Sequence, residues 1–131
     1  FCLRMPILLP RKEKSSRSYL RGLLYPALER FTCGKPKIRY RNCVLIFRHV
    51  YDHNRPEREY RDHDNIELNT VVDAVTMFFL VDDTPFECRH YYCSVVGDEE
   101  STEVLPNTLA THILSSQPLP PHRKPPSCLY L

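Results

Sequence analysis

The spacing of apolar residues along the chain predicts two helices. The first lies over 18–31, where leucines recur every three to four residues, and Pro26 within it predicts a kink or a break. The second covers about 65–76 and carries one apolar stripe. Asp64 and Glu67 have the spacing of a capping box at its start.

The remaining apolar runs predict strands. The strongest, 38–51, has apolar residues on both faces from 43 to 47, so we expect it in the interior of a sheet. Further strands are predicted, in chain order, over 5–9, 78–83, 86–96 and 102–105, the last two joined by a hairpin turn at 97–101.

These elements fit one α+β domain over 5–105, with a small mixed or antiparallel sheet packed by two helices. Residues 106–131 contain six prolines and no sustained period, which predicts a flexible, disordered tail. No apolar run reaches the ~18 residues of a membrane span. The first ten residues lack a basic segment followed by a cleavage site, so we expect a cytoplasmic protein without disulfides.

Charge is divided unevenly along the chain. Residues 1–61 hold 15 of the 18 Lys and Arg and 5 of the 16 acids, whereas residues 62–104 hold one Arg and 11 acids. A basic half joined to an acidic half suits a protein that binds a polyanion and holds cations near it. The alternative is that the two halves simply attract each other.

The sharpest chemistry lies in the segment Arg-Asp-His-Asp-Asn at 61–65. On an extended segment Asp62 and Asp64 would point the same way and converge on one cation. A helix rising roughly 18 Å, followed by a strand covering roughly 20 Å, would return Asp83 beside them. Three carboxylates predict a Mg²⁺ or Mn²⁺ site. Taken singly, Asp64 could be only a helix cap and Asp83 only part of a charged turn.

The order of these motifs resembles the RusA family of Holliday-junction resolvases, in which a D-x-D-N segment and a helix precede a later Asp pair. The resemblance covers about 5–104 and implies a homodimeric, Mg²⁺-dependent endodeoxyribonuclease acting on branched DNA in recombination or repair. It implies that Asp62, Asp64 and Asp83 bind the metal and are catalytic. Under this hypothesis the basic residues that contact the nucleic acid are Arg11, Lys12, Lys14, Arg17, Arg21, Arg55, Arg58 and Arg61.

Three alternatives stay open. RusA-like enzymes carry a lysine where this chain has Leu68, which favours a non-catalytic nucleic-acid-binding or adaptor protein of the same fold. The chain also resembles an uncharacterised bacterial family with a similar segment at 61–65. A structural zinc site is the third alternative, with candidate ligands at Cys88, His90, Cys93, His49 and His53.

Overall fold

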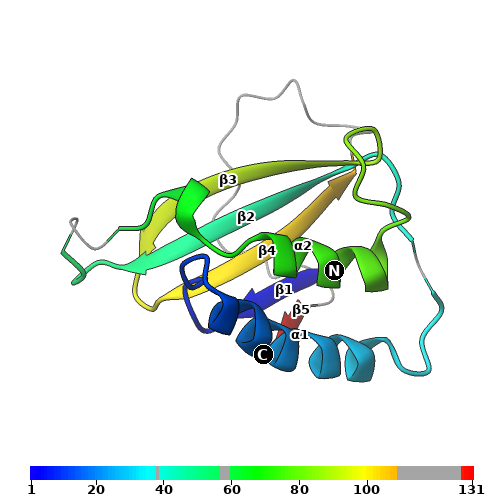
Figure 1. Ribbon diagram of the computed structural model, residues 1–131, viewed down its shortest axis with the longest axis horizontal. Helices are drawn as coiled ribbons and strands as arrows, with labels where there is room; N and C mark the ends of the chain where they lie inside the picture. The colour runs from blue at the N-terminus through cyan, green and yellow to red at the C-terminus, as the bar shows by residue number, and fades with distance from the viewer. Residues whose placement is uncertain (38, 57–59, 109–127) are drawn as a thin grey trace.

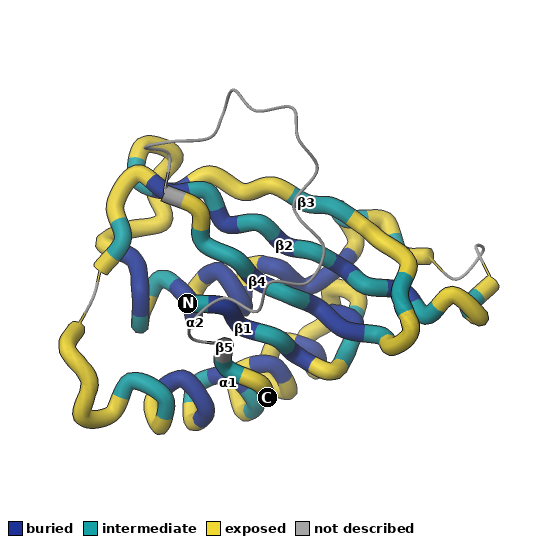
Figure 2. Tube along the Cα trace, turned by 180° about the vertical axis from the view of Figure 1, so that it is seen from behind, coloured by how far each residue is buried: buried dark blue, intermediate teal, exposed yellow. Residues whose placement is uncertain are grey.

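Two helices cover one face of a five-stranded sheet in the computed structural model, which describes residues 1–37, 39–56, 60–108 and 128–131. Both helices lie in front of the sheet in Figure 1 and behind it in Figure 2. The elements are β1 (Cys2–Met5), α1 (Lys14–Thr32), β2 (Cys43–Asp52), the 3₁₀ helix η2 (His63–Asn65), α2 (Asn69–Phe79), β3 (Cys88–Gly97), β4 (Ser101–Thr108) and β5 (Cys128–Tyr130). The α+β class is therefore confirmed.

The sheet is mixed, with the strand order β3-β2-β4-β1-β5. Strands β2 and β3 are parallel and joined through α2, whereas β4 is antiparallel to β2 on its other side. The expected hairpin between the last two strands is therefore wrong, because 98–100 cross the end of β2. Gly97 fits this crossing, since a Cβ there would lie 2.7 Å from Cγ1 of Val50.

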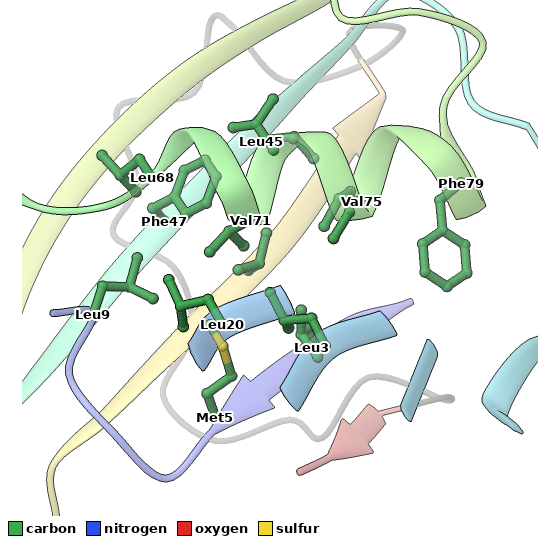
Figure 3. Close-up of a cluster of buried hydrophobic side chains, with 14 of the residues drawn as sticks. Leu3, Met5, Leu9, Leu20, Leu45, Phe47, Leu68, Val71, Val75 and Phe79 are labelled. Carbon is green, nitrogen blue, oxygen red and sulfur yellow. The ribbon is translucent and has the colours of Figure 1, made fainter. Parts of the chain in front are cut away.

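Strand β2 occupies the interior position that its sequence predicts. Its odd-numbered residues are buried against the helices, and its even-numbered residues are half-buried on the other face. The core joins this inner face to both helices, and Figure 3 shows its side chains. Leu45 and Phe47 come from β2, Leu20 from α1, and Val71 and Val75 from α2.

Helix α1 is continuous from Lys14 to Thr32, so Pro26 does not divide it. Helix α2 begins at Asn69, later than predicted, and ends at Phe79. The predicted strand at 78–83 is wrong, because only Leu80 bridges to another residue, Tyr40. Val71, Val75 and Phe79 are buried at a spacing of four, so the apolar face of α2 continues to Phe79. The helix therefore includes aromatic residues at 78–79 that favour strands.

The ends of the chain also differ from expectation. The first strand is Cys2–Met5 rather than 5–9, and β4 continues to Thr108, past the expected boundary at 105. Residues 128–130 form β5, parallel to β1, where the sequence predicted only a tail. The rest of that tail, 109–127, lies outside the described residues. Among the helices that the structure describes, none has the length and apolarity needed to cross a membrane.

Candidate functional site

The segment 61–65 is a tight turn rather than an extended strand. Asp62 has extended backbone angles, and the chain then enters the 3₁₀ helix His63–Asn65. With about three residues per turn, side chains two apart in such a helix do not share a side. Asp62 and Asp64 are exposed, whereas His63 is half-buried against the sheet. The expectation of an extended pair of aspartates is therefore wrong.

Asp83 lies in the loop between α2 and β3, where its backbone N–H donates to Oδ1 of Asp82 at 2.8 Å. It lines a cavity of about 390 Å³ with Asp73, His90 and residues of both helices, and neither Asp62 nor Asp64 lines that cavity. Across the described part of the chain, no three His, Cys, Asp or Glu side chains are placed to hold a metal ion. The structure thus does not bring the three predicted ligands together, and the Mg²⁺ site stays a prediction.

The carboxylate that organises this region is Glu67, which sequence reasoning assigned only to a capping box. Its side chain is 1 % exposed, and Oε1 accepts hydrogen bonds from the N–H and the hydroxyl of Thr70 at 3.3 and 3.1 Å. Its Oε2 accepts a bond from Nε of Arg17 at 3.2 Å. Glu67 therefore caps α2 itself, and Asp64 makes no cap bond. The only sequence signal was an acid just before an apolar helical stripe.

Leu68 is the residue that the predicted RusA resemblance compares with a lysine. It is buried in the core beside Val71 and Phe47 and precedes the first residue of α2 (Figure 3). A lysine there would lose its hydration, so this position does not suit a cation.

Two of the predicted nucleic-acid contacts, Arg61 and Arg55, have partners within the fold. Arg61 donates to the backbone oxygens of Leu8 and Leu9, and its own N–H donates to the hydroxyl of Tyr51. Arg55 forms an ion pair with Glu100. Arg58 lies outside the described residues.

The other five basic residues gather at the start of α1, and we name them the basic strip: Arg11, Lys12, Lys14, Arg17 and Arg21. All five are exposed. Lys12 donates through Nζ to the backbone oxygen of Asp64 at 2.6 Å, which joins the strip to the 3₁₀ turn. Arg17 alone among them forms an ion pair with an acid within the described residues, the pair with Glu67.

A second polar group lies under the 3₁₀ turn, on the inner face of β2 and β3. His49 is 2 % exposed, and neither ring nitrogen has a hydrogen-bond partner among the described residues. Burial, with smaller contributions from His63 and Arg61, lowers the pKa of His49 to about 4. The ring centroids of His49 and His63 lie 5.7 Å apart, and Nε2 of His63 lies 3.1 Å from Oγ of Ser94.

The structure does not assemble the predicted zinc ligands. Cys88 lies opposite Cys43 in the register of β2 and β3, and both thiols are free. Burial raises the pKa of Cys88 to about 12, which opposes the thiolate that zinc needs. Cys93 lies an odd number of residues after Cys88 on β3, so its side chain faces the other side of the sheet. Nδ1 of His53 lies 3.6 Å from Oδ1 of Asp52, and His53 is not beside His49.

The fold and these groups define a small α+β protein with a basic helix start and a buried histidine, His49, beside a half-buried one, His63. Residues 1–108 match a family of unknown function, DUF6100, and the chain belongs to that family. No curated protein and no solved structure matches the chain. The resemblance to the RusA resolvases therefore stays a prediction.

Proposed function

We propose that this protein binds nucleic acid through the basic strip, and that binding does not require a metal ion at Asp62, Asp64 and Asp83. The observation that carries the proposal is the placement of Lys14, Arg17 and Arg21 on one exposed face of α1. Their spacing of three and four residues puts them on one side of the helix. They span about 10 Å along it, a distance over which a nucleic-acid backbone offers several phosphates.

The backbone at the start of the strip is also held in place before any ligand arrives. Arg11 forms a bridge with Ile66, and the N–H of Lys12 donates to the oxygen of Asn65 at 3.1 Å. Cations carried on an ordered backbone lose less conformational freedom on binding than cations on a loose arm, so more of their attraction to phosphate appears as affinity.

Metal-dependent cleavage is less well supported than binding. It would require Asp62, Asp64 and Asp83 to converge, and the turn at 61–65 and the separate cavity at Asp83 oppose this. We therefore favour the binding-only hypothesis and treat cleavage of branched DNA as an outcome of the same assay. The homodimer implied by the RusA resemblance would present two basic strips to one branched ligand.

The test is a titration of a synthetic four-way junction, a duplex and a single strand at several salt concentrations, with EDTA. The variant replaces Lys12, Lys14 and Arg21 by Ala. Arg17 is left in place because it pairs with buried Glu67, so its loss would mix stability with binding. We expect weaker binding for all sequences and a log–log salt slope reduced by about 0.9 for each lost phosphate contact.

A matched control removes three other exposed charges by replacing Arg30, Lys37 and Arg89 with Ala. Equal losses in the two triple variants would mean that only net charge matters, and unchanged binding in the strip variant would refute the proposal. A parallel reaction with Mg²⁺ and Asp64→Asn reports cleavage. Cutting by the native chain that Asp64→Asn abolishes would favour the nuclease instead. Sedimentation of the native chain with and without junction measures the dimer.

A further inference from the structure

His49 has no explanation within the proposed function. Its imidazole lies on the inner face of β2, 2 % exposed, and both ring nitrogens are without hydrogen-bond partners in the part of the chain that the structure describes. Buried polar groups nearly always have a partner, and an unpaired buried ring therefore points to a missing ligand. An apolar side chain would fill this core position without that cost.

The nearest polar ring is His63, from the turn that lies over the sheet. The two ring centroids are 5.7 Å apart with an angle of 50° between the planes. Zn–N distances of about 2.0 to 2.1 Å and a tetrahedral angle place the centroids of two ligating imidazoles roughly 5 to 5.5 Å apart. A shift of a few tenths of an ångström would allow both rings to ligate one ion.

Ser94 gives His63 the support that a metal ligand needs. Oγ of Ser94 lies 3.1 Å from Nε2 of His63, so the hydroxyl can accept a hydrogen bond from the Nε2 proton. In that tautomer Nδ1 is unprotonated and can donate its electron pair to a metal. A hydrogen bond to the other ring nitrogen is the usual way in which proteins orient a ligating histidine.

We propose that His49 and His63 bind one transition-metal ion of the Zn²⁺ or Co²⁺ type, with water in the remaining positions. Neutral imidazole suits these ions, whereas Mg²⁺ prefers oxygen ligands. The site differs from the predicted Asp62–Asp64–Asp83 site in its ligands and in the class of metal. It also does not depend on nucleic-acid binding. Bound metal would fasten the 3₁₀ turn to β2, since His63 comes from the turn and His49 from the strand.

The experiment uses the full chain, freed of metal with EDTA, exchanged into EDTA-free buffer and kept reduced. Zn²⁺ titrated by calorimetry should bind with one equivalent, and Mg²⁺ should not. His63→Ala should weaken Zn²⁺ binding at least tenfold. His53→Ala is the control, because His53 is exposed and lies beside Asp52 and Asp98. It should bind Zn²⁺ within twofold of the native chain.

Two further measurements keep the test independent of folding. NMR of the histidine rings should show that Zn²⁺ shifts the signals of both His49 and His63 in the native chain. The Co²⁺ spectrum should lack the intense thiolate charge-transfer bands. Absence of stoichiometric binding, unchanged affinity in His63→Ala, or thiolate bands that disappear in Cys33→Ser or Cys93→Ser would overturn the proposal.

Discussion

Replacing Glu67 should reveal how α2 is anchored, because one nearly inaccessible carboxylate holds both its first turn and Arg17. Glu67→Ala leaves the N–H and hydroxyl of buried Thr70 without their acceptor. Bonds to a charged group contribute about 1.5 to 3 kcal/mol each, and removing the carboxylate also removes its desolvation cost. We therefore expect a net loss of about 2 to 3 kcal/mol in the free energy of unfolding.

Two companion variants separate the cap from the ion pair. Glu67→Gln keeps an oxygen for Thr70, so it should cost only about 1 kcal/mol. Arg17→Ala should cost a similar amount, because its side chain is 61 % exposed and solvent screens the pair. Both changes remove the same interaction, so the double variant should cost less than the sum of the two.

Urea unfolding followed by far-UV circular dichroism measures the native chain and the four variants. Loss of less than 0.5 kcal/mol in Glu67→Ala would refute the argument, as would strict additivity in the double variant. The same series checks a premise of the nucleic-acid experiment, which leaves Arg17 untouched because it contributes to stability.

Three further outcomes follow from single residues. In EDTA, His49 should contribute stability that is fully present above pH 6.5 and lost as the pH falls towards 4, because the unfolded chain takes up the proton first. The full loss is about 3 kcal/mol, and about 2 kcal/mol of it falls between pH 7.5 and 5. Urea unfolding at these two pH values should show that difference in the native chain and not in His49→Gln. Gly97→Ala should cost roughly 1 to 3 kcal/mol in urea unfolding, since its Cβ would meet Val50 at 2.7 Å; an unchanged midpoint would place the crossing of β2 elsewhere. Asp64→Ala should change the unfolding free energy by less than about 0.5 kcal/mol, because the Asp64 side chain makes no cap bond; a loss near 1 kcal/mol would restore it as a cap.

The sequence predicted those elements whose signal is local. Strand β2 is apolar at successive positions, which favours the interior of a sheet, and the leucine spacing of α1 favours a helix. Pairing was less predictable, because a β3–β4 hairpin and a crossing over β2 have the same short link. Strand β5 depends on its pairing with β1, since three residues after a proline-rich stretch carry no periodicity of their own.

The residue types at 61–65 also do not determine by themselves whether the two aspartates can bind one cation, because that depends on the backbone conformation. On an extended backbone the two carboxylates of an Asp-x-Asp pair point the same way, whereas a 3₁₀ turn of the same residues directs them to different sides. The turn forms here because both of its neighbours are fixed, Arg61 by the oxygens of Leu8 and Leu9, and Ile66 by its place in the core. His63 therefore faces the sheet, where it lies between His49 and Ser94. Within 61–65, His63 is thus the residue whose side chain lies beside other polar side chains. The spacing of the two aspartates gave no reason to choose it.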